Sequence, residues 1–408
     1  MASDNSDFEI VIIGGGAAGI ATAASLHKRE PSLKIAIIEP SGTHYYQPGW
    51  TMVGGGVFDP EQTAREMARV MPDYVSWIRQ SAAAFEPGDN TVILADGSRI
   101  KYVFLVVAAG LQLDWDGVEG LSDTLGRNGV TSNYRFDLAP YTWELVQQLR
   151  SGKALFTQPP MPIKCAGAPQ KAMYLSCSEW QKRGVLKDID VHFHNAGGVL
   201  FGVAEYVPAL MEYVERYGIS LDLNERLTAV DGSAKTATFA TENGSKTVEF
   251  DMLHVCPPQS APDFIKSSPL AGEGGWVDVD QETLRHARYD NVFALGDCSN
   301  TPNAKTAAAA RKQAPIVASN LIATILGKPL PSRYDGYGSC PLTVEHGKIV
   351  LAEFGYGGKL LPSFPGWALD GRKPTRRAWV LKADVLPRIY WEAMLKGREW
   401  LVKPGHVG

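Results

Sequence analysis

The chain has 408 residues, with 44 acidic and 40 basic side chains and a formal net charge of −4. No overall positive field therefore argues for a nucleic-acid partner. Its 45% of hydrophobic residues can build two or three domains. Mean hydropathy is −0.13, no apolar run reaches the roughly 18 residues of a membrane span, and the polar, acidic stretch 1–7 is unlike a signal peptide.

The most informative stretch of the sequence lies near its N-terminus. β-Branched residues at 8–13 end in a glycine cluster, and a small-residue helix pattern begins at Ala17. In this strand–turn–helix, Gly14 permits the tight turn, Gly16 lets the backbone approach a pyrophosphate, and Gly19 lets the helix pack closely on the strand. The pyrophosphate is expected at the helix N-terminus, where free N–H groups point outward.

A second strand at 34–38 supports this interpretation. It ends at Glu39, twenty residues after Gly19, where an acid can accept hydrogen bonds from a ribose. The pattern predicts a dinucleotide site, and on its own it leaves open whether the ligand is FAD or NAD.

The next elements surround the same expected crevice. A loop at 40–50 contains Gln47 and several aromatic residues, which would either flank a flavin ring or simply pack together. A helix is expected near 61–70 and a hairpin over 84–100. An apolar strand at 102–110 then ends in small residues that would touch the dinucleotide, Ala109 and Gly110.

A second α/β unit is predicted after residue 150. Its first strand, 153–157, runs into a proline-rich loop that holds Cys165, followed by a helix at 170–180. Its next strand, 189–194, ends in a glycine pair at 197–198 without the spaced triplet or the following acid. We expect this unit to keep the α/β layout but not to bind NAD(P).

Further strands are expected in a small meander over 227–250 and in a buried strand at 252–256. The strand at 291–295 ends in a glycine–acid pair, in which the carboxyl group can bind a ribityl hydroxyl. An alanine-rich helix follows, and its N-terminus can stabilise a reduced flavin. The candidate residues in this region are Gly296, Asp297, Lys305 and Thr306.

The five cysteines include no C-x-x-C pair and no zinc-type spacing. Cys177, Cys256 and Cys298 are expected to be small buried residues, whereas Cys165 and Cys340 lie in loops bounded by glycine and proline. The segment Val385–Val402 mixes aromatic and basic residues. It fits a membrane-interface helix and a helix docked on the body equally well.

Several stretches resemble the flavoprotein sulfide:quinone oxidoreductases, most closely the mitochondrial-type branch. They are residues 164–171, 201–203, 275–280, 305–309 and 334–342. The resemblance implies an α/β fold with two Rossmann-like dinucleotide-binding domains, of which the first binds FAD and the second is degenerate. The expected parts are 1–115 with 250–330 for FAD, 116–249 carrying Cys165, and a membrane-associated region 331–408 carrying Cys340.

The same resemblance implies that Cys165 and Cys340 form a redox pair that oxidises sulfide to sulfane sulfur. Two electrons then pass through FAD to ubiquinone. Sulfite, glutathione, cyanide or sulfide would accept the sulfur, and a homodimer is left open. The location implied is peripheral, on a bacterial inner membrane or, if a presequence was removed, on the mitochondrial inner membrane.

Two further residues, His194 and Lys312, are candidates for proton handling, although each is more often structural. The main alternative function is a type II NADH:quinone dehydrogenase, which needs a working second glycine motif. A non-enzymatic flavoprotein is the third hypothesis. The fold alone does not separate these classes.

Overall fold

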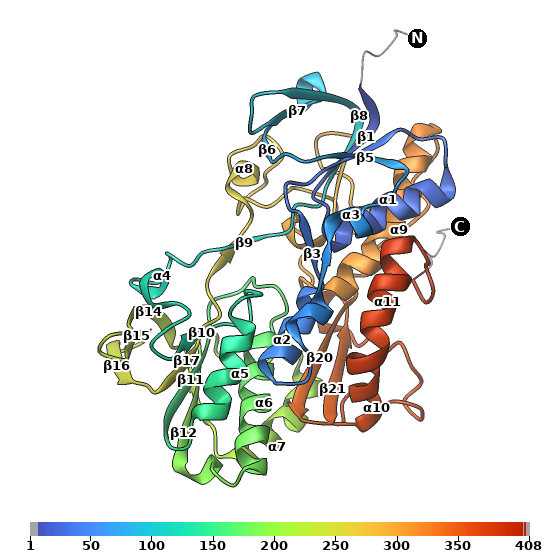
Figure 1. The fold of residues 1–408 in the computed structure, drawn as a ribbon. Coiled ribbons are helices and arrows are strands. Elements are labelled where there is room, and N and C mark those ends of the chain that lie inside the picture. The colour runs from blue at the N-terminus through green and yellow to red at the C-terminus, as the bar shows by residue number, and fades with distance from the viewer. Residues whose placement is uncertain (1–6, 403, 405–408) are drawn as a thin grey trace.

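The computed structural model describes residues 7–402 and 404, which form two α/β lobes and a C-terminal region beside them (Figure 1). The first lobe holds a seven-stranded sheet in the order β5-β2-β1-β8-β7-β6, with β19 pairing with β8. Its strands are β1 (Phe8–Ile13), β2 (Ile35–Ile38), β5 (Val75–Ile78), β6 (Ala82–Glu86), β7 (Thr91–Leu94), β8 (Arg99–Val107) and β19 (Val292–Ala294).

The central strands of this sheet are parallel, and helices cover them. Ile12 of β1 lies opposite Ile37 of β2 and Val106 of β8, and all three are fully buried. Strands buried on both faces need such continuous β-branched runs. The strand β1, the helix that follows it and the 84–100 hairpin are confirmed. The covering helices are α1 (Ala17–Arg29) and α9 (Ala307–Ile325), which pack on each other.

The second lobe is built on a five-stranded parallel sheet in the order β10-β17-β11-β12-β13. β17 pairs with β11 in this sheet, so the second lobe extends past the expected boundary at residue 250. The predicted meander is present as β14 (Arg226–Asp231), β15 (Thr236–Thr241) and β16 (Gly244–Glu249). The other elements are β10 (Val130–Thr131), β11 (Gly152–Gln158), β12 (Ile189–Asn195), β13 (Ser220–Leu223), β17 (Met252–His254), α4 (Leu121–Thr124), α5 (Ala139–Gln148), α6 (Ala168–Lys182) and α7 (Val207–Tyr217).

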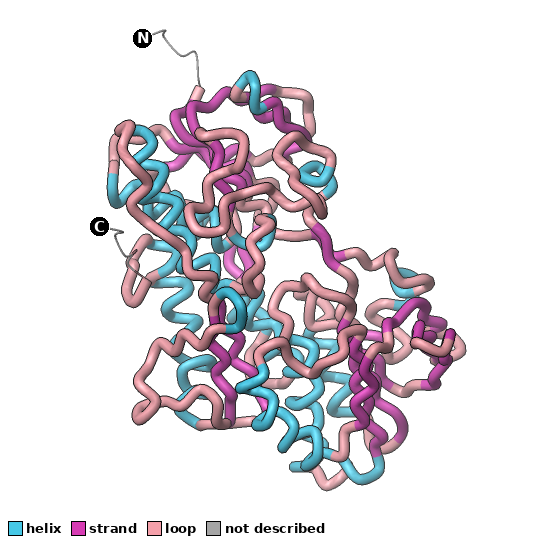
Figure 2. The backbone as a smooth tube through the Cα atoms, turned by 180° about the vertical axis from the view of Figure 1, so that it is seen from behind, coloured by secondary structure: helices cyan, strands magenta, loops and turns pink. Residues whose placement is uncertain are grey.

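The chain crosses between the lobes as a narrow two-stranded ribbon. β9 (Gln112–Leu113) pairs antiparallel with β18 (Gln259–Ser260), and the view from behind shows this ribbon bridging the two bodies (Figure 2). Short elements complete the first lobe and its connections: β3 (Thr43–Tyr45), β4 (Ala64–Glu66), α2 (Trp50–Gly54), α3 (Met67–Val70) and α8 (Asp263–Lys266). The helix expected near 61–70 is found only in its last turn, as α3, because β4 interrupts that segment by pairing with β3.

The C-terminal region begins with a hairpin of β20 (Gly338–Glu345) and β21 (Lys348–Phe354), and α10 (Arg376–Val380) packs on β21. A single helix over Val385–Val402 is not found. Instead, a π-turn at Leu381–Val385 leads into α11 (Leu386–Glu392), a 3₁₀ turn follows, and Gly397 then adopts a left-handed φ of +65°.

Two contacts fasten this region to the first lobe. The Glu399 carboxylate pairs with Arg29 and accepts a hydrogen bond from Ser25, both on α1. On the cavity side, the ring of His44 hydrogen-bonds the Tyr390 hydroxyl at 2.7 Å. The C-terminal segment is therefore a docked element with its own buried partners. Among residues 7–402 and 404, the structure contains no helix that is both long and apolar enough to cross a bilayer.

Candidate functional site

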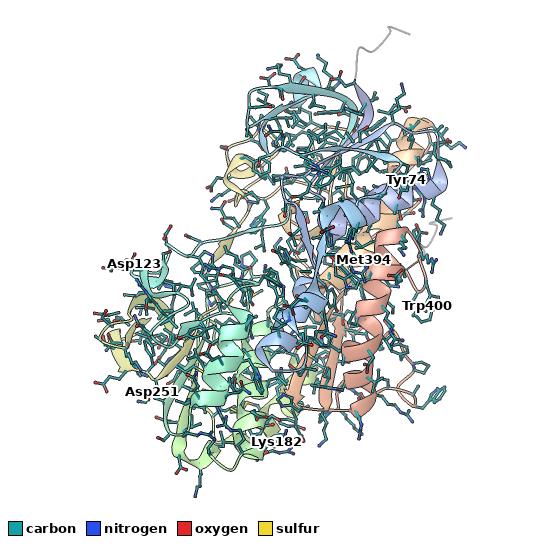
Figure 3. The ribbon with its side chains drawn as sticks, in the orientation of Figure 1. Tyr74, Asp123, Lys182, Asp251, Met394 and Trp400 are labelled. Atoms are coloured by element: carbon teal, nitrogen blue, oxygen red, sulfur yellow. The ribbon has the colours of Figure 1, made fainter. Side chains whose placement is uncertain are left out.

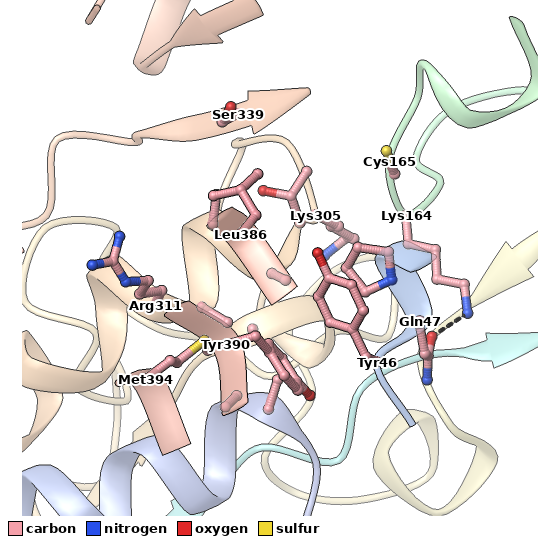
Figure 4. A pocket seen from close by; sticks show the side chains of 18 of the residues that line it. Tyr46, Gln47, Lys164, Cys165, Lys305, Arg311, Ser339, Leu386, Tyr390 and Met394 are labelled. Carbon is pink, nitrogen blue, oxygen red and sulfur yellow. Dashed lines mark hydrogen bonds between the residues drawn. The ribbon is translucent and has the colours of Figure 1, made fainter. Parts of the chain in front are cut away.

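A cavity of about 1010 Å³ runs through the molecule where the two lobes and the C-terminal region meet. One end follows the glycine loop, and the other reaches the apolar side chains of α11 (Figure 4). Most predicted cofactor residues line it, although they come from distant parts of the sequence. They are Gly14, Gly16, Ala17, Glu39, Gln47, Ala109, Gly110, Gly296, Asp297, Lys305 and Thr306.

The geometry of the glycine loop explains why it needs glycine. Gly14 has a φ of +98°, and a Cβ there would lie 2.6 Å from the carbonyl oxygen of Ala108. Gly19 does not line the cavity. Its backbone packs directly against Gly14, which is the helix–strand contact predicted for the third glycine. The Glu39 carboxylate accepts a hydrogen bond from the Gly15 N–H at 2.8 Å.

The opposite wall is formed after β19 and at the start of α9. Burial raises the pKa of Asp297, and the nearby Lys305 ammonium opposes this effect. The Lys305 ammonium donates to the Asp297 and Ser299 carbonyls, each at 2.8 Å, and lies 4.0 Å from the Trp276 ring centroid. Thr306 caps α9, whose first turn lines the cavity. The positive end of that helix therefore faces the cavity.

The dimensions of this region suit an elongated dinucleotide. A Cβ on Gly16 or Gly110 would meet no atom within 4 Å, so space lies directly against the backbone at both positions. The N-terminus of α1 opens into that space, which is the arrangement that binds a pyrophosphate. On these observations the residues present fit a flavin dinucleotide.

The two expected redox cysteines meet in space. Cys165 and Cys340 are 175 residues apart in sequence, and their sulfur atoms lie 3.6 Å apart. Cys165 adopts a left-handed φ of +49°, which is uncommon for a residue with a side chain. Gly167 permits the approach, because a Cβ there would lie 2.5 Å from the Cys340 sulfur. Cys165 faces the cavity, whereas Cys340 is buried behind it.

Two lysines surround this sulfur pair. Lys171 lies in the first turn of α6, and its ammonium donates to the Cys165 sulfur at 2.9 Å. The hydrogen bond from Cys340 and the positive charge of Lys171 hold the pKa of the Cys165 thiol well below its usual range. The pKa of Cys340 is raised by that same contact and by burial. The site therefore favours a thiolate on Cys165 and a protonated Cys340.

Lys382, in the π-turn, is the second of these lysines. Its side chain is buried, and its ammonium donates to the Pro48 carbonyl at 3.3 Å. Burial, together with repulsion from Lys171, lowers its pKa to about 7. An amine with that pKa exchanges protons at neutral pH. Elsewhere on the wall, Lys164 donates to Gln47 at 2.7 Å, a contact drawn in Figure 4.

The two candidates for proton handling lie in different surroundings. Lys312 lines the cavity, with its ammonium 5.8 Å from the Tyr337 ring centroid. His194 is not a cavity-lining residue. It stacks on Phe239 and pairs with Glu225 at 2.8 Å on the far side of β12.

His192, His194 and Asp222 bring three ligand-type atoms within 4.8 Å of one another. The Lys246 ammonium already lies 3.4 Å from Asp222, so a fixed cation accompanies this cluster. The arrangement is that of a structural network of hydrogen bonds between neighbouring strands.

The sequence analysis assigned no role to three residues that line the cavity: Lys171, Lys382 and Glu353, which lies on β21. Lys171 stands in the quoted stretch 164–171, six residues after Cys165, so its position within the motif was available as a signal. Lys382 and Glu353 carried no such signal, because only the fold brings them to the cavity.

The chain was compared with known proteins. The family model described as pyridine nucleotide-disulphide oxidoreductase matches residues 8–157 and 194–314. A mitochondrial sulfide:quinone oxidoreductase from Dictyostelium discoideum is 44% identical over 97% of this chain and 87% of that protein. The mouse protein of the same name is 39% identical over 96% and 87%.

Among solved structures, the sulfide:quinone oxidoreductase of Aquifex aeolicus superposes with a TM-score of 0.80 at 20% identity, covering 95% of this chain and 91% of that one. At this level of identity the match concerns the fold, and it agrees with the two α/β lobes described above. The identities of 39–44% over nearly the whole chain carry the closer assignment. The chain belongs to the mitochondrial-type sulfide:quinone oxidoreductases.

Proposed function

We propose that this protein oxidises sulfide at Cys165 and Cys340 and passes two electrons through FAD to a membrane quinone. One observation carries the proposal: the two sulfur atoms lie 3.6 Å apart beside Lys171, at the wall of the cavity that also follows the glycine loop. The names of the curated relatives support the same reaction.

In this proposal the N-terminus of α1 would hold the pyrophosphate of FAD. When bound, FAD would supply a two-electron carrier between the sulfur pair and the quinone. Gly14 permits the turn, Gly16 leaves space for the phosphates, and Glu39 is placed to accept from a ribose hydroxyl. Asp297 would bind the ribityl chain. The N-terminus of α9 would favour negative charge on the ring.

The sulfur chemistry follows from thiol–disulfide exchange. In the oxidised enzyme a disulfide joins Cys165 to Cys340, or one extra sulfur atom bridges them. HS⁻ attacks the Cys340 sulfur of a disulfide, so that a persulfide forms there and the S–S bond breaks to release Cys165 as a thiolate. An acceptor such as sulfite, glutathione, cyanide or sulfide removes the outer sulfur. Reforming the disulfide then releases two electrons.

The two lysines explain why the released charge falls on Cys165. Burial alone would lower the pKa of Lys171, but the adjacent Cys165 raises this pKa by more than burial lowers it. The ammonium therefore stays charged and stabilises the thiolate. Lys382, with a pKa of about 7, would take up or release a proton as the sulfur charge changes.

The quinone is assigned to the far end of the cavity. Apolar side chains of the C-terminal region gather there, which suits the ring and tail of a hydrophobic acceptor. They are Leu351, Phe364, Leu381, Leu386 and Ile389.

A membrane surface would deliver that quinone. Trp367 is 88% exposed and Trp400 60% exposed, and the Trp400 side chain projects from the C-terminal side of the molecule (Figure 3). Exposed tryptophans beside basic residues suit the membrane interface. Peripheral attachment of the C-terminal region is therefore part of the proposal.

Serine variants of the two cysteines test the sulfur route. Cys165→Ser and Cys340→Ser should each retain flavin and lose sulfide-dependent quinone reduction by at least about a thousandfold, because neither can form the disulfide. Cys177→Ala is the matched control, since Cys177 is buried in α6 and does not line the cavity. Full activity in either serine variant would refute the assignment.

A further inference from the structure

The β20–β21 hairpin separates the core of the second lobe from the cavity, because its side chains alternate between two faces. Cys340 lies opposite Ala352, and both pack into the core of the second lobe. Their neighbours Ser339 and Glu353 also lie opposite each other. These two residues line the cavity on the other face of the hairpin. They lie toward its apolar end, the proposed quinone site, hereafter the chamber. Cys340 and the proposed quinone end of the cavity thus lie on opposite faces of one hairpin.

Glu353 is the unusual residue on this wall. It is only 5% exposed, yet no basic side chain within salt-bridge distance accompanies its carboxylate among the residues the structure describes. It is instead held by three donors. It accepts from the Tyr337 hydroxyl at 2.6 Å, from the Ser363 hydroxyl at 2.5 Å and from the Ser363 N–H at 3.1 Å. A buried carboxylate is costly, so these contacts stabilise it in the chamber wall.

The three side chains form a hydrogen-bonded chain along the cavity wall that reaches solvent. Tyr337, Glu353 and Ser363 all line the cavity, and Ser363 is also exposed at the surface. The Tyr337 and Ser363 oxygens also lie 3.1 Å apart. Burial and the Glu353 charge raise the pKa of Tyr337, so its hydroxyl stays protonated and able to donate. Lys312 lies beside the Tyr337 ring and adds positive charge to this part of the chamber.

Quinone reduction needs such a path. Quinone takes up two electrons and two protons to become quinol. Oxidation of HS⁻ to sulfane sulfur releases two electrons and one proton, so one further proton must come from solvent in each turnover. The apolar side chains around the proposed quinone site carry no exchangeable protons, so polar groups of the cavity wall are placed to supply one.

We propose that Ser363, Glu353 and Tyr337 form the proton relay that carries this solvent proton to the quinone oxygen. The Glu353 carboxylate takes up a solvent proton at Ser363 and passes it to Tyr337 as Tyr337 gives its own hydroxyl proton to the reduced quinone, so Glu353 returns to the carboxylate form. The inference rests on the proposed function, because it assigns the chamber to quinone. It concerns the second half of the reaction and is independent of the cysteine chemistry.

The relay is tested on flavin that has been reduced by dithionite without sulfide, so that Cys165 and Cys340 play no part. Glu353→Gln and Tyr337→Phe should slow flavin reoxidation by decylubiquinone at least about tenfold, within the range for loss of a proton-transfer group. Their solvent deuterium isotope effect on that step should rise above that of the wild type. Ferricyanide takes electrons without protons, so reoxidation by ferricyanide should be unchanged.

Glu345→Gln is the matched control, because Glu345 lies on the same strand pair but binds Tyr213 and Lys348 outside the cavity. Wild-type rates with decylubiquinone in Glu353→Gln, at an unchanged isotope effect, would overturn the relay. Equal slowing with both oxidants would also overturn it, since that result indicates general damage to the site. If sulfide fails to reduce the wild-type flavin, the sulfide route fails while this test remains valid.

Discussion

The two α/β lobes each carry glycines in a turn between a strand and a helix, with opposite outcomes. In the first lobe β1 ends at Ile13 and α1 begins at Ala17, so the turn between them consists only of glycines. The helix N-terminus opens into the cavity, and Glu39 lies beside it. Backbone donors, space and a carboxylate therefore converge at one point.

In the second lobe the turn with the glycine pair is long and filled, and it follows β12, which holds the sheet position of β2 rather than that of β1. β12 ends at Asn195 and α7 begins only at Val207. Between them, Leu200 and Phe201 are buried in the local core, and Asn195 bonds across the loop to the Val199 carbonyl at 2.9 Å. The space that a phosphate would need holds the protein's own side chains.

The nearby acids differ in the same way. Glu39 faces the cavity, whereas Asp222, on the strand next to β12, already bonds His192 at 2.8 Å and lies near Lys246. The first turn is thus open to a dinucleotide, whereas the second is filled by contacts between the protein's own residues. This difference agrees with the proposed entry of electrons through the sulfur pair, which lies at the wall of the same cavity.

Matched glycine substitutions in the two turns should give the largest difference between the lobes. Gly16→Val should fold, because a Cβ there meets nothing within 4 Å, but it fills the space of the phosphates. We expect the flavin content of the purified protein to fall at least about tenfold. Gly197→Val, in the exposed turn of the second lobe, should retain full flavin content. Equal loss in both variants would mean that the second turn also binds nucleotide.

Removal of the Lys171 charge is expected to have the next largest effect. Lys171⁺ lowers the pKa of Cys165, so Lys171→Met raises it, and each unit by which that pKa then exceeds the pH lowers the thiolate fraction about tenfold. Flavin reduction by sulfide should slow at pH 7 and recover as the pH rises. Stopped-flow absorbance over a pH series measures this. Lys182→Met, at the exposed end of α6, should match the wild type at every pH.

A small effect is expected in the second lobe. Lys246→Met removes the cation between Asp222 and Glu225, and this half-exposed network should lose about 1 kcal/mol of unfolding free energy or less. Urea denaturation measures the change. Flavin content and sulfide oxidation should stay at wild-type values; a fall in either would connect this cluster to the active site.

Much of the first lobe could be predicted because its signals are local. The run 8–13, the glycines after it and the 84–100 hairpin each specify their own conformation, and the structure confirms them. The helix near 61–70 is reduced to α3 because β4 pairs with β3, a tertiary contact that overrides helical periodicity. The single helix expected over Val385–Val402 is not formed, because α11 ends at Glu392, and a 3₁₀ turn and the left-handed Gly397 follow it.

The residues of the site also divide into those with a signal in the sequence and those placed only by tertiary contacts. Cys165 and Cys340 were identified through family motifs, and only the fold explains their 3.6 Å separation. Lys382 and Glu353 were missed, since a lysine in a π-turn and a glutamate in a strand look like ordinary surface residues in the sequence. Their burial depends on β20, β21 and α11 packing against distant parts of the chain.

The central claim is that the glycine loop of the first lobe holds the nucleotide and that electrons arrive through sulfur. Anaerobic titration of the flavin-loaded protein, first with NADH and then with sulfide, tests it most directly. The flavin spectrum should be unchanged with NADH. With sulfide the flavin absorbance should bleach, and a long-wavelength charge-transfer band from the Cys165 thiolate should appear. Rapid bleaching by NADH, with no response to sulfide, would contradict it.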